Sequence, residues 1–391
     1  MKMPPKDLLQ VALGGFIALM VGLALARFVY TPILPYMEAE LGITKTQAGL
    51  IASANFLGYL VGAVFAAKGS LPGSVRNWLL SSLLICAVTT MAMGWTTSFD
   101  LLLVLRVVGG CATSFVMIFG SALVLTRLAA RGHSGLSAVH FAGVGMGIAA
   151  SAILISVLAK AGVGWQGMWI WSGAISLVLV IPVYFLIPSP PPQDVRQQVS
   201  GKPVFSRPLK ALIVAYFLLG FGYIITATFI SVLVKQVPEL QWMQSIVWLV
   251  VGIAAIPSVA FWTWLGVKIG SSYTYAIACI ALAIGVAVSV LGHGEVSFLV
   301  ASALLGATFM GLTALGLVNA RELLPDYPRQ IMAIMSIAFG LGQMIGPTFA
   351  GFAHEIYGSF MVPSLVAAIG LIIAAFLVVF IKEKDSSAAK P

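Results

Sequence analysis

Residues 24–37 read ALARFVYTPILPYM and form the second half of the first long apolar segment of the chain. Arg27 lies ten residues before the end of that segment, and Pro32 and Pro35 follow it. Burying an arginine in lipid costs about 2.5 to 3.5 kcal/mol on insertion scales, so such a residue normally faces a protein interior or a water-filled cavity. We therefore predict that Arg27 contacts a substrate. The alternative is an arginine that snorkels or pairs helices, although at about 1.5 Å per residue it lies about 15 Å from the segment end.

The composition is that of a polytopic membrane protein. Of 391 residues, 60% are hydrophobic and only 8% are charged, whereas an ordinary soluble domain has about 25% charged residues. The net charge of +9 does not indicate nucleic-acid binding, because the basic residues lie between apolar segments rather than on one face. Cys86, Cys111 and Cys279 all lie within apolar segments and therefore predict neither disulfides nor a metal site.

Twelve apolar segments are near or above the length of about 20 residues that crosses a bilayer. Their limits are residues 8–37, 46–67, 78–97, 100–127, 135–160, 168–188, 209–235, 242–266, 272–292, 296–321, 329–356 and 359–381. The longest polar interruption separates six segments from six. We predict an all-α membrane protein with an N-terminal six-helix bundle at 1–188, a cytoplasmic linker at 189–208, and a C-terminal six-helix bundle with a short cytoplasmic tail at 209–391.

Lysine and arginine are divided unequally between the two sides of the predicted bundle. Sixteen lie on the side of both termini and the linker: Lys2, Lys6, Lys68, Arg76, Arg127, Arg131, Arg196, Lys202, Arg207, Lys210, Lys268, Arg321, Arg329, Lys382, Lys384 and Lys390. Lys45, Lys160 and Lys235 lie on the other side. Because positively charged loops stay in the cytoplasm, we predict that both termini are cytoplasmic. The remaining two basic residues, Arg27 and Arg106, lie within membrane segments.

No acidic residue lies deep in a predicted membrane segment, because all twelve are in loops, tails or segment ends. Cation sites and proton relays of many pumps need a carboxylate within the membrane. Its absence disfavours a proton-driven exporter of cationic drugs, and it leaves Arg27 and Arg106 without a predicted counter-ion. An anionic substrate would supply one.

Two pairs of glycine-rich segments relate the two halves of the chain. RVVGGCAT at 106–113 lies six segments before ALLGATFMG at 303–311, and HFAGVGMG at 140–147 lies six segments before FGLGQMIGP at 339–347. Small residues at one-turn spacing allow helices to approach closely and to bend during a transport cycle. We predict packing or gating roles for the glycines of these segments, namely Gly110, Gly145, Gly147, Gly342 and Gly346.

The chain resembles the major facilitator superfamily in its twelve segments, its linker after the sixth segment and an arginine four residues before Gly110. GFGYIITATF at 220–229, GATFMGLTALGL at 306–317 and HFAGVG at 140–145 resemble the YbfB/YjiJ-like bacterial branch. The resemblance covers essentially the whole chain. It implies the major facilitator fold of two pseudo-symmetric six-helix halves, a substrate cavity lined chiefly by segments 1, 4, 7 and 10, and a multi-pass protein of the bacterial inner membrane.

One loop departs from the superfamily pattern. The loop after the second segment usually carries an aspartate and several basic residues, whereas residues 56–77 hold only Lys68 and Arg76 and no acid. The usual charge-based cytoplasmic gate between segments 2 and 11 is therefore not expected.

Arg106 is the second candidate anion contact. It lies six residues past Asp100, roughly 10 Å into the membrane at helical rise, and Arg27 reaches a similar depth on the first segment. Two guanidinium groups could bind one carboxylate or phosphate through planar pairs of donors, a geometry that lysine does not provide. The alternative roles for Arg106 are coupling and helix packing.

Neutral polar side chains complete the predicted site. Tyr30 lies one turn from Arg27, and three further pairs each share one helical face: Asn55 and Tyr59, Tyr223 and Thr226, and Ser336 and Gln343. Their hydroxyl and amide groups could hydrogen-bond a substrate, or they could tie helices together. His140 is a candidate proton carrier, because imidazole titrates near neutral pH, and packing beside a cytoplasmic loop is its alternative role.

We predict a secondary transporter that moves a small organic anion by alternating access, as a monomer in the lipid bilayer, without cofactor, metal or nucleic acid. Its coupling could run through a proton on the substrate, through His140, or through anion exchange, so symport and antiport both stay open. The second hypothesis is an efflux pump for amphipathic drugs or toxic metabolites, which the 22 Phe and 15 Met residues would suit. An enzyme is not expected, because the sequence shows no cluster of His, Asp, Glu or activated Ser.

Overall fold

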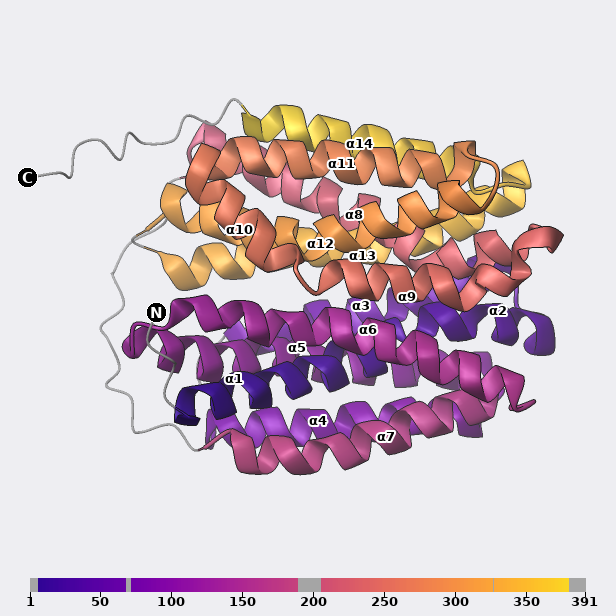
Figure 1. Cartoon of the computed structure of the whole chain (residues 1–391), viewed down its shortest axis with the longest axis horizontal. Helices are drawn as coiled ribbons and strands as arrows, with labels where there is room; N and C mark the ends of the chain where they lie inside the picture. Colours follow the sequence, from indigo (N-terminus) through magenta and orange to yellow (C-terminus); the bar gives the residue numbers. More distant parts are fainter. Residues whose placement is uncertain (1–5, 68–71, 189–204, 326, 380–391) are drawn as a thin grey trace, which may run out of the picture.

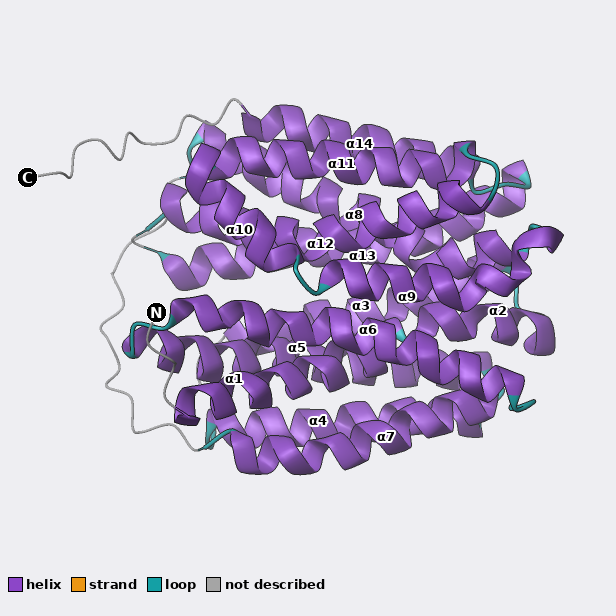
Figure 2. Ribbon diagram, in the orientation of Figure 1, coloured by secondary structure: helices purple, strands orange, loops and turns teal. Residues whose placement is uncertain are grey.

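The computed structural model describes residues 6–67, 72–188, 205–325 and 327–379, and every regular element within these ranges is a helix (Figure 2). The elements are α1 (Lys6–Leu19), η1 (Met20–Phe28), α2 (Tyr30–Leu41), α3 (Lys45–Ala67), α4 (Val75–Ala92), η2 (Met93–Trp95), α5 (Phe99–Ala130), η3 (Ser134–Leu136), α6 (Ser137–Lys160), α7 (Trp165–Leu186), α8 (Arg207–Lys235), η4 (Pro238–Met243), α9 (Gln244–Ala255), α10 (Ser258–Ile269), α11 (Ser271–Leu291), α12 (Glu295–Leu323), α13 (Pro328–Tyr357) and α14 (Met361–Val379). Apolar helices suit a membrane because they satisfy their backbone hydrogen bonds internally.

Eleven of the described helices are long and apolar enough to cross a membrane. The pair Pro238–Ala255 and Ser258–Ile269 makes a twelfth span if the two are counted together. These spans coincide with the twelve predicted segments to within four residues at each end. The predicted all-α membrane fold is confirmed.

Two of the spans are interrupted in ways that the segment limits do not reveal. The first span passes through a π-helical segment, η1, between α1 and α2. The eighth span bends by 42° between α9 and α10, where Pro257 lacks the N–H that a continuous helix would use. Both interruptions lie within the apolar segments rather than at their ends.

The helices form two groups that lie side by side (Figure 1). Helices α1 to α7 lie on one side and α8 to α14 on the other, with α3 packed against α13 and α6 packed against α9 between them. The predicted division into two six-helix domains follows this arrangement and remains a prediction. Residues 189–204 of the predicted linker lie outside the described residues.

Serine and glycine residues mark several helix ends. Ser74, Ser98 and Ser206 precede α4, α5 and α8, and each side chain accepts a hydrogen bond from the backbone N–H three residues later. Gly42 and Gly358 end α2 and α13 at φ of 67° and 69°, a conformation that costs glycine little. These two turns lie at the end of the bundle that also holds Lys45, which we call the Lys45 end; the α1 N-terminus lies at the opposite end (Figure 1).

The membrane orientation is testable with two exposed lysines at opposite ends of the bundle. Lys202 and Lys390, where the charge count predicts a cytoplasmic location, lie outside the described residues. Lys210 and Lys160 lie within them and are exposed. In a variant without native cysteines, Lys160→Cys should react with an impermeant maleimide on intact cells, because its loop is predicted to be outside. Lys210→Cys should react only after the cells are opened, and the reverse pattern would overturn the predicted orientation.

Candidate functional site

Arg27 lies at the end of η1 and is buried inside the bundle, with 5% of its surface exposed. Its Nε and Nη2 atoms have no hydrogen-bond partner among the residues that the structure describes. Most buried polar groups are paired, and π-helical turns often occur at functional sites. The unpaired donors therefore mark Arg27 as a candidate binding group.

Aromatic rings surround the guanidinium group of Arg27. Its Cζ atom lies 4.2 Å from the ring centre of Phe56, 4.9 Å from that of Tyr59 and 5.3 Å from that of Phe28. Each such cation–π contact contributes about 0.5 to 2 kcal/mol. The rings compensate part of the cost of burying the charge, but they occupy none of its N–H groups.

A small cavity joins Arg27 to the other half of the molecule. It is lined by Arg27, Phe28, Tyr30, Thr31, Ala52, Phe56 and Arg106 from the first group of helices, and by Ile224, Ala227 and Thr228 from α8. The lining includes no carboxylate. The cavity volume is about 10 Å³, about the room for one water molecule. A substrate could therefore occupy this position only after the two groups of helices separate.

Arg106 lines the same cavity, but its donors are engaged. Nη1 donates to the carbonyl of Ala26 at 3.2 Å, Nη2 to that of Arg27 at 3.5 Å, and Nε to that of Ile51 at 3.4 Å. No carboxylate lines the cavity beside either arginine, but only Arg27 keeps donor atoms without a hydrogen-bond partner among the described residues. A direct substrate contact by Arg106 stays a prediction.

Two of the predicted polar contacts serve helix pairing in this structure. The Tyr30 hydroxyl donates to the Ala48 carbonyl at 2.8 Å, which joins α2 to α3. Asn55 Nδ2 donates to the Arg106 carbonyl at 3.1 Å, which joins α3 to α5. Their substrate contacts remain predictions, and Tyr59 is the predicted member of α3 that lies against Arg27.

On the opposite side of the interface, Tyr223 is the centre of a stacked aromatic group. Its ring stacks between Phe309 at 5.5 Å and Phe339 at 5.7 Å, and its hydroxyl accepts a hydrogen bond from Gln343 Nε2. Gln343 Oε1 and the nearby Thr226 Oγ1 have no hydrogen-bond partner within the described part of the chain. Tyr223 and Gln343 therefore form a polar pair with spare acceptor capacity opposite Arg27.

His140 lies apart from the residues that line the cavity. It is fully buried, its Nε2 atom lies 3.1 Å from Ser121 Oγ, and its Nδ1 atom faces Gly15 of α1. This location joins α6 to α1 and α5. Proton transfer by His140 remains a prediction, and the helix contact is the role that the geometry supports.

The predicted packing glycines all lie against neighbouring helices. A Cβ atom on Gly110 would overlap the Asn55 carbonyl. On Gly147 it would meet Ala24 and Met20, while on Gly342 and Gly346 it would meet the α8 backbone. Gly145 is different, because its Cβ would lie 2.6 Å from the Ile256 nitrogen in the other group of helices. Its contact lies at the bend between α9 and α10.

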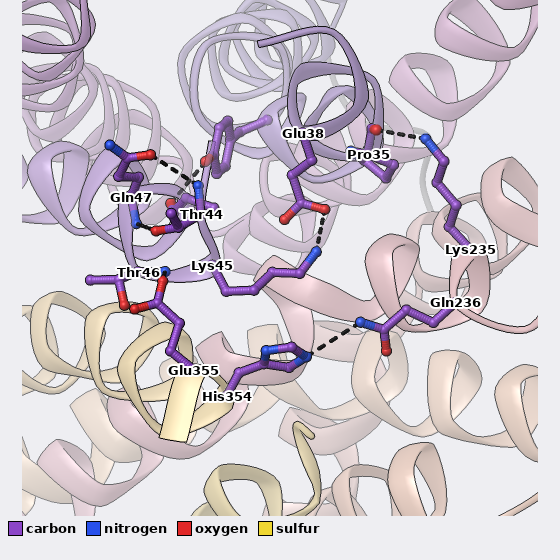
Figure 3. A network of polar contacts seen from close by, with 12 residues as sticks. Pro35, Glu38, Thr44, Lys45, Thr46, Gln47, Lys235, Gln236, His354 and Glu355 are labelled. Atoms are coloured by element: carbon purple, nitrogen blue, oxygen red, sulfur yellow. Dashed lines mark hydrogen bonds and ion pairs between the residues drawn. The ribbon is translucent and has the colours of Figure 1, made fainter. Parts of the chain in front are cut away.

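The two groups of helices are joined at the Lys45 end by polar contacts (Figure 3). Lys235 Nζ donates to the Pro35 carbonyl at 2.7 Å, and the Thr46 N–H donates to Glu355 Oε1 at 3.0 Å. Lys45 pairs with the half-buried Glu38 at 2.5 Å. Nearer to Arg27, the Thr31 hydroxyl donates to the Ala227 carbonyl at 2.7 Å. The contacts of Lys235, Thr46 and Thr31 join the two groups of helices between Arg27 and the Lys45 end.

Sequence reasoning missed the aromatic residues of the site. Phe28 packs its ring against Trp248 and Phe309 from the other group of helices, and Phe56 lies over Arg27. The Trp248 indole N–H is buried without a partner. In the sequence, only their spacing from Arg27 distinguishes these aromatic residues from the many that face lipid.

Comparison with known proteins places the chain among transporters. The model of a family described as "Uncharacterised MFS-type transporter YbfB" matches residues 19–379. The 4-hydroxybenzoate transporter PcaK of Acinetobacter baylyi is 26% identical over 156 residues, which make up 40% of this chain and 34% of that protein. PcaK of Pseudomonas putida is 28% identical over 160 residues, 40% of this chain and 35% of that protein. The matches span about a third of the length of these curated relatives.

The fold also matches a solved transporter. The crystal structure of nucleoside transporter NupG superposes with a TM-score of 0.73 at 16% sequence identity, covering 95% of this chain and 98% of that one. At this identity the likeness concerns the fold alone.

Proposed function

This chain belongs to the family of the uncharacterised MFS-type transporter YbfB, and on that premise we propose that it carries a small organic anion with an aromatic ring by alternating access. The observation that carries the proposal is Arg27, a buried cation with two donor nitrogens that have no partner among the described residues and with no carboxylate in the lining of its cavity. A carboxylate can accept both hydrogen bonds in a planar, bidentate pair. The PcaK relatives, which are named for an aromatic acid, support the same class of substrate.

The surroundings of Arg27 favour a substrate with a flat apolar body. Phe28, Phe56 and Tyr59 face the guanidinium group, and the stack around Tyr223 lies opposite. Aromatic rings bind one another with offset or edge contacts. We infer that the carboxylate pairs with Arg27 while the ring of the substrate enters between the two groups of helices when they separate.

The proposed setting follows from the family and the orientation. We place the protein in the bacterial inner membrane as a monomer, with both termini cytoplasmic and the Lys45 end outside. The structure is then closed to the outside. A proton on the substrate or exchange of one anion for another would suffice for coupling, since His140 does not line the cavity.

Binding of benzoate by the purified protein tests the proposal. Benzoate should raise the unfolding temperature of the protein, because a ligand that binds the folded state stabilises it by mass action. The increase should grow as the benzoate concentration rises above the dissociation constant. Benzamide, which has the same ring without the charge, should have little effect. Stabilisation by benzamide and by a cationic dye, but not by benzoate, would reject the anion site and favour the efflux pump.

Removal of the Lys235 contact should open the Lys45 end. Lys235→Met removes a hydrogen bond between the two groups of helices, and such a bond from a charged group is worth about 1.5 to 3 kcal/mol when buried and less at this half-buried site. We expect a severalfold faster reaction of a cysteine at the cavity-lining Thr228 with an impermeant reagent added outside. Lys268 lies at the opposite end of the helix bundle, and Lys268→Met is the matched control. Equal rates in the two variants would show that Lys235 does not hold the closed state.

A further inference from the structure

We infer that Arg106 is a positioning residue: its guanidinium group donates to backbone carbonyls of the first span where that span has too few N–H groups of its own, and it thereby sets the place of Arg27. Only the effect on anion binding rests on the proposed function. The support of the backbone can be tested without any substrate.

The backbone changes its hydrogen-bond register just after Arg27. The Val29 N–H donates five residues back, to the Ala24 carbonyl at 2.8 Å, whereas the Ile33 N–H donates four residues back, to the Val29 carbonyl at 3.3 Å. Between them, Pro32 has no N–H to donate. The first span therefore passes from π-helical to α-helical pairing across a residue that cannot contribute.

This change leaves carbonyl groups without backbone donors. In α- or π-helical pairing, the four carbonyls of residues 25–28 accept hydrogen bonds from N–H groups four or five residues ahead, which are those of residues 29–33. The Val29 and Ile33 groups are already used and Pro32 has none, so Tyr30 and Thr31 are the two that remain. The Phe28 carbonyl therefore lacks a backbone donor, because its two candidates are Pro32 and Ile33. The carbonyls of residues 25–27 share the N–H groups of Tyr30 and Thr31, so one of these three also needs a donor from elsewhere, since a buried carbonyl without a partner is costly.

Arg106 donates to two of the three carbonyls that share the N–H groups of Tyr30 and Thr31. Its Nη1 and Nη2 atoms donate to the carbonyls of Ala26 and Arg27 at 3.2 and 3.5 Å, and its Nε atom donates to the Ile51 carbonyl of α3. One side chain from α5 thus holds η1 and α3 together. A guanidinium group presents these donors in one rigid plane, whereas an ammonium group is a compact point charge.

The arrangement around Arg106 prevents it from leaving the backbone. It is 4% exposed, its Cζ atom lies 5.1 Å from the ring centre of Tyr30 and 5.9 Å from that of Trp169, and its own carbonyl accepts from Asn55. The backbone of Arg27 is therefore held by a partnered arginine, while the Nε and Nη2 atoms of Arg27 have no hydrogen-bond partner among the described residues. Two arginines on one cavity have different roles.

Hydrogen–deuterium exchange of the full-length protein in lipid nanodiscs tests the backbone role. Arg106→Lys keeps the charge and loses the planar donors, and amides of residues 20–34 should exchange at least about tenfold faster. Thr113→Val is the matched control, because it removes one neutral hydrogen bond from the same helix to the η1 carbonyl of Gly22, and its effect should be clearly smaller. Exchange in Arg106→Lys equal to that of the wild-type protein would overturn the inference.

A second substitution gives a specific rescue. Pro32→Ala restores a backbone N–H within reach of the carbonyls of residues 27 and 28. In the Arg106→Lys background it should return exchange of residues 20–34 most of the way to the wild-type rate, and it should restore folding if Arg106→Lys alone fails to fold. If residues 20–34 exchange as fast in the double variant as in Arg106→Lys, Arg106 does not compensate for a shortage of backbone donors.

The effect on the site is measured with benzoate as the probe. Arg106→Lys should weaken benzoate binding at least about tenfold, but it should cause no further loss in the Arg27→Ala background, because it acts through Arg27. Equal losses in both backgrounds would mean that Arg106 contacts the anion itself and would overturn the positioning role. If benzoate does not bind the wild-type protein, the proposed substrate class fails, and the exchange measurements still decide the role of Arg106.

Discussion

Replacing Arg27 with alanine is expected to weaken benzoate binding about thirtyfold or more. Arg27 is 5% exposed, and two of its nitrogen atoms have no hydrogen-bond partner among the described residues. Truncating one member of a buried, hydrogen-bonded charge pair costs about 2 to 5 kcal/mol, and 1.4 kcal/mol is about a factor of ten. Isothermal titration or thermal shift of the purified variant measures the loss.

Arg27→Lys should recover only part of the affinity. Lysine restores the charge but presents it as a point rather than as a pair of planar donors. The order of benzoate affinity is therefore expected to be wild type, then lysine, then alanine. A lysine variant equal to the wild type would show that charge matters without the bidentate geometry.

Two controls separate binding from folding. Arg131→Ala removes the same charge at an exposed site and should leave benzoate affinity unchanged. The yield and unfolding temperature of Arg27→Ala should be at least those of the wild type, because the substitution removes a costly buried charge from the membrane. A well-folded Arg27→Ala protein with wild-type affinity would reject the anion site, and Arg27 would then be a packing residue.

Gly145→Leu is expected to stop transport while leaving benzoate binding measurable. A Cβ atom at this position would lie 2.6 Å from the Ile256 nitrogen and 2.8 Å from the Gly252 carbonyl. Both belong to the other group of helices, and they are backbone atoms that cannot rotate away. A leucine side chain should therefore force α6 and α9 apart and hold the protein in one state of the cycle.

Uptake of radiolabelled benzoate into proteoliposomes measures this effect. Transport by Gly145→Leu should fall to the level of empty liposomes, and Gly145→Ala should reduce it less, because a methyl group needs a smaller shift. Gly135→Leu is the control, since a Cβ atom there meets no atom within 4 Å. Normal uptake by Gly145→Leu would mean that α6 and α9 do not need to approach at this point.

The number and place of the membrane spans followed from the sequence alone. A bilayer requires about twenty consecutive apolar residues for each helix, and this requirement acts locally along the chain. The segment limits therefore agreed with the helices to within four residues. The motifs at 140–145, 220–229 and 306–317 also sufficed for the family, which the match over residues 19–379 confirms. Arg27 stood out for a local reason as well, because a charge within an apolar segment is visible without any tertiary contact.

The different roles of Arg27 and Arg106 were decided only by the tertiary structure. In the sequence both are arginines in membrane segments without a nearby carboxylate. Which one keeps free donors depends on a contact between Arg106 and the carbonyls of Ala26 and Arg27, about eighty residues away. The backbone shifts register at η1 and has too few N–H groups there, and α5 packs beside η1 with a side chain that donates to two of its carbonyls. Hydropathy and motif spacing carry no information on such a pairing, because it exists only once two distant helices lie side by side.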